Sequence, residues 1–257
     1  MLTKYDGFIF DLDGTIYVGD KLIPKADEVI YHLKKSNKKV IFITNKTTGS
    51  VKQYCEFLKK NNLNVIESEI INSTLVTKKY LEDKHPNEKF YAIGEEVFIN
   101  EIEEIGLEFS KDPNEIKIVL ITLDRTLDYS KLEIAAKALD NGARFYAANI
   151  DDTCPVEGGE IWDAGSTISA LEKRTHFKLE KHFGKPSNYM MNEILNKLNI
   201  PREKCLLIGD RVETDIAMGN SFGIDTALVS TGVFKNFDGN EKYIPTYKIN
   251  SIYDIIK

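Results

Sequence analysis

The first group of residues that could do chemistry is Asp11-Leu12-Asp13-Gly14-Thr15. It follows the short apolar run Phe8-Ile9-Phe10, whose aromatic and β-branched residues predict a buried strand. Open α/β sheets bind ligands at the carboxyl ends of their strands. Two carboxylates crowded there repel each other, so a cation, a shared proton or distance must compensate. Because Mg²⁺ takes carboxylate and carbonyl oxygens, we expect Asp11 to be a nucleophile and metal ligand and Asp13 an acid/base.

The same Asp-x-Asp-Gly pattern also occurs in plain turns and in calcium-binding loops. An EF-hand loop needs an oxygen ligand at its fifth position, glycine at the sixth and a bidentate glutamate at the twelfth. Here Thr15 could serve at the fifth position, but Ile16 and Leu22 occupy the other two. The pattern therefore does not fit an EF-hand, whereas a plain turn stays an alternative that the rest of the chain must decide.

Three further stretches lie at the end of a predicted strand or in a loop that can face the same sheet edge. They are Thr44-Asn45, Gly184-Lys185-Pro186 and Gly209-Asp210-Arg211-Val212-Glu213-Thr214-Asp215. Together they add carboxylates, a lysine and a hydroxyl, which suits phosphoryl transfer because that reaction needs charge neutralisation and in-line positioning. Each stretch alone has a simpler interpretation as a loop, a helix cap or a solvated helix residue. Their joint order and placement favour the catalytic interpretation.

The expected metal ligands follow from charge. A carboxylate that attacks a phosphate dianion meets repulsion, which Mg²⁺ between Asp11 and a phosphate oxygen would remove. Asp210 is the expected second carboxylate ligand, and Asp215 is expected to hold a metal-bound water or to orient a ligand. Asp13 is expected to complete the metal shell through its backbone carbonyl, with water and substrate.

The remaining phosphate oxygens need a cation and hydrogen-bond donors. We expect Lys185, the Thr44 hydroxyl and the neighbouring Asn45 to bind them, with N–H groups of the loop after Asp11. Asp13 is expected to protonate the leaving alkoxide and later to accept a proton from the attacking water. The expected intermediate is an acyl phosphate on Asp11.

The elements that must position these residues alternate between strand and helix. A helix over 26–34 is followed by the β-rich run 39–45, and strand–helix–strand order is typical of a parallel sheet. The other expected helices are 50–61, 95–105, 129–141, 166–173, 189–198, 214–222 and 251–256, and the other expected strands are 89–93, 116–122, 144–148, 205–210 and 225–230.

The simplest architecture that these elements allow is an α/β fold with a parallel core made from both ends of the chain. A second α/β domain is then inserted after the second predicted strand and the helix that follows it, as surface positions with close ends allow. We expect the core to comprise residues 1–75 and 181–257 and the inserted domain to comprise residues 76–180.

Composition limits the possible partners and the compartment. The 257 residues carry a net charge of −6, which argues against nucleic acid, because a nucleic-acid backbone needs basic stripes. Cys55, Cys154 and Cys205 have no paired spacing, which fits reduced thiols in a cytoplasm. We expect no membrane helix, since no apolar stretch reaches the roughly 18 residues that one needs.

With these residues in place, the sequence resembles the haloacid dehalogenase superfamily of phosphohydrolases. Asp11 to Thr15 match its first motif, Thr44 the second, Lys185 the third, and Asp210 with Asp215 the fourth. The second aspartate of the first motif points to phosphatases or phosphomutases, because the dehalogenases lack it. The resemblance covers the whole chain and implies a Rossmann-like, doubly wound core and a Mg²⁺ cofactor.

The long insertion resembles the α/β cap of the NagD-like and 4-nitrophenyl phosphatase branch. The resemblance rests on Ile43-Thr44-Asn45, on Ala148-Asn149-Ile150-Asp151 followed by Pro155, and on Gly209 to Ile216. It implies a cap over the site and small organic phosphates as substrates, among them sugar phosphates, nucleoside monophosphates and 4-nitrophenyl phosphate. A homodimer is expected by analogy only.

The chain departs from that branch at two places. Lys46 stands where the branch usually has asparagine, and Asp163 stands where its cap usually has proline. Similar departures in relatives tied to sugar metabolism favour sugar phosphates. Asn149 and Asp151, after the cap strand that ends at Ala148, are the predicted substrate contacts of the cap, although both residue types are also common turn formers.

Three functions stay open on this reading. A Mg²⁺-dependent phosphatase is favoured by the complete set of motifs. A phosphomutase or phosphotransferase would use the same residues and would differ in how the cap excludes water. A non-catalytic phosphate-binding regulator is disfavoured, because Asp11, Asp13 and Lys185 are all present.

Overall fold

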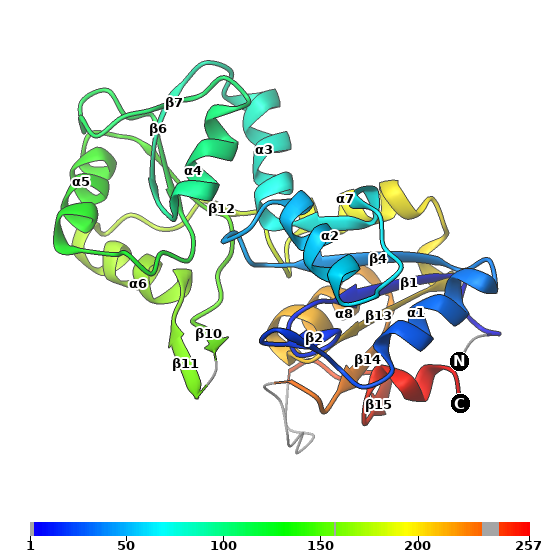
Figure 1. Ribbon diagram of the computed structural model, residues 1–257. Coiled ribbons are helices and arrows are strands. Elements are labelled where there is room, and N and C mark those ends of the chain that lie inside the picture. Colours follow the sequence, from blue (N-terminus) through cyan, green and yellow to red (C-terminus); the bar gives the residue numbers. More distant parts are fainter. Residues whose placement is uncertain (1–2, 157, 233–241) are drawn as a thin grey trace. The chain divides into compact units, whose positions relative to one another are not determined.

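The structure, a computed structural model, describes residues 3–156, 158–232 and 242–257, which form two compact units. The first unit comprises Met1–Thr44, Val51–Ile71 and Lys185–Lys257, and the second comprises Asn45–Ser50 and Asn72–Gly184. Figure 1 shows the first unit mainly in blue and in yellow to red, and the second mainly in green. Both ends of the chain thus build one unit, and the short segment Asn45–Ser50, which we expected in the core, belongs to the second.

The first unit contains a six-stranded sheet in the order β15-β14-β13-β1-β4-β5. The strands are β1 (Gly7–Asp11), β4 (Lys39–Thr44), β5 (Ile70–Asn72), β13 (Cys205–Gly209), β14 (Asp225–Val229) and β15 (Tyr247–Ile249). Strand β1 pairs in parallel with β4 on one side and with β13 on the other, and the chain then proceeds outward in both directions. β1 is therefore the switch point of a doubly wound sheet, where such folds bind ligands.

Helices cover both faces of this sheet. The core cluster on one face joins Phe8 and Phe10 of β1 to helix α1 (Ala26–Lys35) and helix α2 (Val51–Lys60). Because side chains alternate along a strand, Thr226 faces away from the neighbouring core residue Ala227. Its methyl group lies 2.1 Å from a Cβ built on Gly219 of helix α8 (Ala217–Phe222), which places α8 on the other face. Helix α7 (Asn188–Leu198) buries Met190, Met191, Ile194 and Leu198 outside that cluster.

Sequence features favour the helical conformation of α1. Its buried residues include Val29, Ile30 and Leu33, as predicted from their helical spacing. Acidic residues in its first turn and basic residues in its last turn complement the helix dipole. The structure thus agrees with the predicted strand–helix–strand unit at the start of the chain.

Short elements complete the first unit. Strands β2 (Tyr17–Val18) and β3 (Lys21–Leu22) form an antiparallel hairpin after the first motif. The predicted helix 214–222 is a π-helix over Val212–Ile216 followed by α8, and the predicted last helix is a 3₁₀-helix over Ile252–Ile255. Two further 3₁₀-helices span Glu67–Glu69 and Arg202–Lys204.

The second unit has its own five-stranded sheet in the order β12-β9-β8-β6-β7, with parallel neighbours. Its strands are β6 (Lys89–Ile93), β7 (Glu108–Phe109), β8 (Ile118–Ile121), β9 (Arg144–Ala147) and β12 (Lys181–His182), and its helices are α3 (Ser73–Lys84), α4 (Glu96–Glu103), α5 (Tyr129–Asp140) and α6 (Ala164–Thr175). Strands β10 (Thr153–Val156) and β11 (Gly159–Trp162) form a separate antiparallel hairpin. Gly106 and Gly142 follow α4 and α5 with φ of 90° and 91°, as predicted for residues that end helices.

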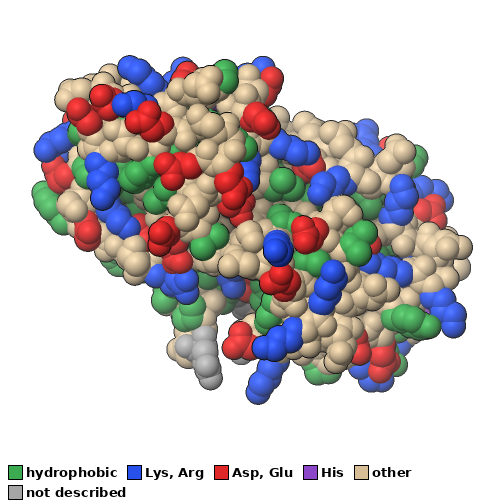
Figure 2. Space-filling view, turned by 45° about the horizontal axis from the view of Figure 1, so that its top comes forward, with side chains coloured by type: hydrophobic (Ala, Val, Ile, Leu, Met, Phe, Trp, Pro, Cys, Tyr) green, Lys and Arg blue, Asp and Glu red, His purple; other side chains and the backbone are tan. Residues whose placement is uncertain are grey.

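Two surface properties bear on the expected partners. Figure 2 shows basic and acidic side chains interspersed over the face in view, without a stripe of one sign. Among the described residues, none of the helices has the length and apolar character needed to cross a membrane.

Candidate active site

Strand register places three of the predicted site residues around the end of β1. Asp11 pairs with Ile43 of β4, so Thr44 lies one residue beyond that level. On the other side, Phe10 pairs with Ile208, so Gly209 ends β13 level with Asp11 and Asp210 follows. Parallel strands end at a common sheet edge, which is why residues far apart in sequence meet here.

Lys185, which lies just before α7, also contacts the residues at the end of β1. Its ammonium donates hydrogen bonds to Oδ1 of Asp11 at 2.5 Å and to Oδ1 of Asp215 at 2.7 Å. The start of the helix behind it is fixed by Ser187, whose side chain accepts a hydrogen bond from the backbone N–H of Met190 at 3.1 Å. The predicted lysine and the predicted nucleophile are therefore in direct contact.

Asp215 is held by the π-helix Val212–Ile216. Its backbone N–H donates to the carbonyl of Arg211 at 3.0 Å, and its carboxylate accepts from the backbone N–H of Arg211 at 3.2 Å. Asp11, Asp210 and Asp215 are all buried and offer ligand atoms that lie within 4.8 Å of one another. Carboxylate oxygens at this spacing suit a hard divalent cation.

Charge supports that fit. Three ionised carboxylates and one lysine leave a net charge of −2 in a buried site, which a divalent cation would neutralise. Burial raises the pKa of Asp11 well above its ordinary value; Lys185 opposes this shift, and the other two carboxylates add to it. Burial alone would lower the pKa of Lys185, but its two carboxylate partners outweigh burial and raise that pKa. A cation at the three carboxylates would favour their ionised forms.

Glycines make room for these carboxylates. A Cβ on Gly232 would lie 1.9 Å from Oδ2 of Asp210, and one on Gly14 would lie 2.3 Å from the same oxygen. A Cβ on Gly209 would lie 2.2 Å from Cγ of Asp215. Larger side chains at these positions would displace the carboxylates, so the site requires glycine at these positions.

The Asp13 carboxylate has a different setting. The structure does not place it in the carboxylate group above; its Oδ2 accepts a hydrogen bond of 2.9 Å from the hydroxyl of Tyr17. The carbonyl of the next residue, Gly14, accepts a hydrogen bond of 2.6 Å from the Thr231 hydroxyl. A metal role for Asp13 through its backbone carbonyl stays a prediction.

Asn45, predicted to bind phosphate, belongs to the second unit. Its Nδ2 donates to Oδ2 of Asp151 at 2.9 Å, and its Oδ1 accepts from the Ser73 hydroxyl at 3.3 Å. Asn149 donates to Asp151 at 3.3 Å and to Asp163 at 3.0 Å. The predicted cap residues therefore share one hydrogen-bond network with Asn45, and their role as substrate contacts stays a prediction.

Asp163 also has a local function. Its side chain accepts a hydrogen bond from the backbone N–H of Ala164 and caps α6. Its carboxylate thus links the helix start to the Asn149 amide. The departure from proline at this position is explained within the second unit by these two contacts.

Three residues of the site were not predicted from the sequence. Thr231 and Gly232 follow β14, and the strand-end rule that found Asp210 would have found them too. Tyr17 carried no comparable signal, because a tyrosine in a short strand more often packs in the core.

The fold and the site together define an α/β protein of the phosphoryl-transfer class, with acidic groups and a lysine at the switch point of its sheet. Comparison with known families agrees. A family model of haloacid dehalogenase-like hydrolases matches residues 8–108, and a second model of HAD-like hydrolases matches residues 182–255. The chain belongs to the haloacid dehalogenase-like hydrolases, and it is a phosphatase of that family.

Individual relatives are similar over almost the whole of this chain. The sugar phosphatase AraL of Bacillus subtilis is 33% identical over 252 residues, which cover 98% of this chain and 92% of that protein. A p-nitrophenyl phosphatase from Archaeoglobus fulgidus superposes with a TM-score of 0.92 at 32% identity, covering 98% of both chains. A glycerol phosphate phosphatase from Mycobacterium tuberculosis, solved with magnesium, has a TM-score of 0.87 at 26% identity and covers 99% of this chain and 77% of its own. The predicted fold class and family are confirmed.

Proposed function

We propose that this phosphatase hydrolyses small organic phosphate monoesters with Mg²⁺ and through an aspartyl phosphate on Asp11. The observation that carries the proposal is the contact between Asp11 and Lys185 within a buried group of carboxylates at the sheet switch point. A nucleophilic carboxylate needs a cation beside the phosphate that it attacks, and this arrangement supplies one from the chain itself.

The cofactor assignment rests on the fit of the residues. Asp11, Asp210 and Asp215 would hold Mg²⁺, with the backbone carbonyl of Asp13 as a further ligand. The ion would reduce the repulsion between the Asp11 carboxylate and the substrate dianion.

The protein residues perform the remaining steps. A carboxylate oxygen of Asp11 forms a bond to phosphorus while the ester P–O bond breaks and Asp13 gives its proton to the leaving oxygen. Water then attacks the phosphorus, its proton passes to Asp13, and the bond to Asp11 breaks. Both carboxyl groups return to their starting state, so the cycle closes without another reactant.

Phosphate binding is assigned to Lys185 and the Thr44 hydroxyl in the first unit, with Asn45 as a predicted contribution from the second. Lys185 is 4% exposed and Thr44 is 2% exposed, so both are withdrawn from bulk water. A low-dielectric setting strengthens their interaction with an anion.

The second unit is proposed as the cap that selects the leaving group, with Asn149 and Asp151 as its substrate contacts. All the candidate substrates carry the same phosphate group, so the core motifs that bind it cannot distinguish one substrate from another. The residues that select the leaving group must therefore lie outside these motifs. The relatives named as a sugar phosphatase and a p-nitrophenyl phosphatase support sugar phosphates and 4-nitrophenyl phosphate as substrates.

We propose a cytoplasmic location, because Cys55, Cys154 and Cys205 are buried thiols that form no disulfide with any described residue, which suits a reducing compartment. A homodimer remains a proposal by analogy with proteins that have caps of this size.

The test is phosphate release from sugar phosphates, nucleoside monophosphates and 4-nitrophenyl phosphate, with Mg²⁺ and with EDTA. We compare the wild type with Asp11→Asn and with Asp6→Asn, an aspartate outside the site that pairs with Lys38 at 2.8 Å. Release that is lost in Asp11→Asn and in EDTA but kept in Asp6→Asn supports the proposal. Undiminished release by Asp11→Asn would refute it.

A further inference from the structure

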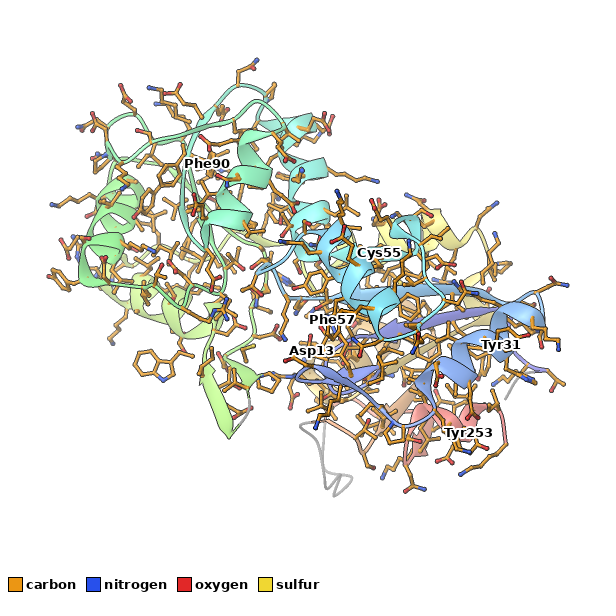
Figure 3. The ribbon with its side chains drawn as sticks, viewed as in Figure 1. Asp13, Tyr31, Cys55, Phe57, Phe90 and Tyr253 are labelled. Atoms are coloured by element: carbon orange, nitrogen blue, oxygen red, sulfur yellow. The ribbon has the colours of Figure 1, made fainter. Side chains whose placement is uncertain are left out.

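Tyr17 is a buried tyrosine whose hydroxyl meets the acid/base residue. It is 4% exposed, and its O–H donates to Oδ2 of Asp13 at 2.9 Å. Its ring packs edge-on against Phe57 of α2, with centroids 5.0 Å apart and an interplanar angle of 77°. Figure 3 shows the side chains of Asp13 and Phe57 in the same part of the first unit.

The backbone holds the same two residues together. Tyr17 begins β2 and forms a β-bridge with Asp13, and its carbonyl accepts a hydrogen bond from the N–H of Gly14 at 2.7 Å. The position of the hydroxyl at the carboxylate is thus fixed by the backbone contacts of this short turn and by the packing of the tyrosine ring on α2. Both supports remain if only the hydroxyl is removed.

The direction of this hydrogen bond differentiates the two oxygens of Asp13. A carboxylic acid carries its proton on one oxygen, and an oxygen that accepts an O–H donor is the disfavoured one for that proton. In this contact the Tyr17 hydroxyl is the donor and Oδ2 of Asp13 is the acceptor. The proton of the acid form is therefore directed to Oδ1.

We propose that Tyr17 is a positioning residue that presents Oδ1 of Asp13 as the oxygen that gives the proton to the leaving group. The proposal rests on the proposed function, because it assigns Tyr17 a part in the acid step of that reaction. In this step the Oδ1–H bond of Asp13 breaks and the proton joins the leaving oxygen as its bond to phosphorus breaks.

This role predicts a dependence on the leaving group. A sugar alkoxide needs protonation as it departs, whereas 4-nitrophenolate departs without it. Loss of the Tyr17 hydroxyl should therefore reduce kcat/KM for a sugar phosphate and spare 4-nitrophenyl phosphate. kcat/KM is the suitable quantity, since it reports the steps through formation of the aspartyl phosphate and not its later hydrolysis.

The experiment compares wild type, Tyr17→Phe and Tyr5→Phe on a sugar phosphate and on 4-nitrophenyl phosphate, with Mg²⁺. Tyr5 is the matched control, because its buried ring also carries a hydroxyl that donates to an aspartate, Asp225, at 2.6 Å. We expect Tyr17→Phe to lose about tenfold or more in kcat/KM on the sugar phosphate and less than about threefold on 4-nitrophenyl phosphate. Tyr5→Phe should change kcat/KM by the same factor for the two substrates.

A second measurement separates positioning from damage to the fold. In an Asp13→Asn background the acid is gone, so adding Tyr17→Phe should cost no further activity on the sugar phosphate. An equal loss on both substrates, no loss on either, or a further loss in the Asp13→Asn background would overturn the role of Tyr17. If the wild type releases phosphate from neither substrate, the proposed function itself has failed, and that result is distinct from the others.

Discussion

The ammonium of Lys185 lies 2.5 Å from the carboxylate of Asp11, although 174 positions separate the two residues in the chain. Their side chains are 5% and 6% exposed, so both charged groups are almost completely removed from bulk water. Both belong to the first unit, one at the end of β1 and the other just before α7. The two ends of the chain must therefore fold together before the site exists.

Removing the Lys185 charge should destabilise the protein as well as inactivate it. Lys185→Met leaves buried carboxylates without their cation, and breaking a buried ion pair in this way costs about 3 to 5 kcal/mol. We expect the free energy of unfolding in urea to fall by about that amount in EDTA, and phosphate release to be lost.

The control for this prediction is Lys178→Met. Lys178 pairs with Glu172 at 2.7 Å, but its side chain is 80% exposed, and exposed pairs contribute about 0 to 1 kcal/mol. Equal unfolding midpoints for Lys185→Met and the wild type would contradict the prediction.

Gly232→Ala should weaken metal binding without unfolding the chain. The added Cβ would lie 1.9 Å from Oδ2 of Asp210, so the carboxylate must move. Displacing a supporting group at a metal site typically costs about 10- to 100-fold in affinity. We expect the Mg²⁺ concentration needed for half-maximal activity to rise by about tenfold or more.

Gly142→Ala serves as the control for that substitution. Gly142 has φ of 91° in the second unit, and a Cβ there would meet no atom within 4 Å. It should cost about 1 kcal/mol or more of stability through backbone strain and leave the Mg²⁺ requirement unchanged. A normal Mg²⁺ requirement in Gly232→Ala would show that the glycine does not shape the site.

Metal removal should lower thermal stability through the same carboxylates. A ligand that binds only the folded state stabilises it by about 2.7 kcal/mol at 100 times its dissociation constant. We expect Mg²⁺ to raise Tm in the wild type and to have little effect in Asp210→Asn, measured by calorimetry. An undiminished Mg²⁺ shift in Asp210→Asn would exclude Asp210 as a ligand.

His182 should make stability depend on pH. Burial lowers its pKa below the ordinary 6.5, with opposing contributions from Gly184 and Asp151. The unfolded chain then binds a proton below about pH 6.5 that the folded chain does not, so stability is complete above that pH and falls as pH decreases. The slope for one proton is about 1.4 kcal/mol per pH unit.

His182→Gln should make that slope shallower between pH 7 and the lowered pKa, as measured by urea unfolding at several pH values. His32→Gln is the control, because His32 is exposed on α1. If both variants keep the wild-type slope, His182 does not carry the effect.

The rule that functional residues follow the carboxyl ends of parallel strands predicted most of the site. It needs only a short apolar run and the polar residues that come after it, and both can be read from the sequence. Apolar runs that stop in polar residues identified Asp11, Thr44 and Asp210, and the parallel register then brings these positions to one edge. The residues found by this rule are those that the strand register alone brings to the site, whatever contacts their side chains make.

The rest depends on packing that the sequence pattern does not contain. Helix α3 was not predicted, because its buried residues include Ser73, Thr74 and Thr77, which give no apolar period. The contact between Tyr17 and Asp13 depends on a short hairpin and on the packing of a ring against α2. Side-chain partners of this kind are decided by tertiary structure.

The central claim, that Asp11 is the nucleophile, has a direct chemical test. Enzyme turning over 4-nitrophenyl phosphate is quenched and treated with borohydride, which reduces an aspartyl phosphate to homoserine, and the peptide that contains Asp11 is sequenced by mass spectrometry. The same is done with Asp13→Asn, in which water attack lacks its base and the intermediate should accumulate. We predict homoserine at position 11 in both proteins, and turnover with homoserine at another position or at none would contradict the account.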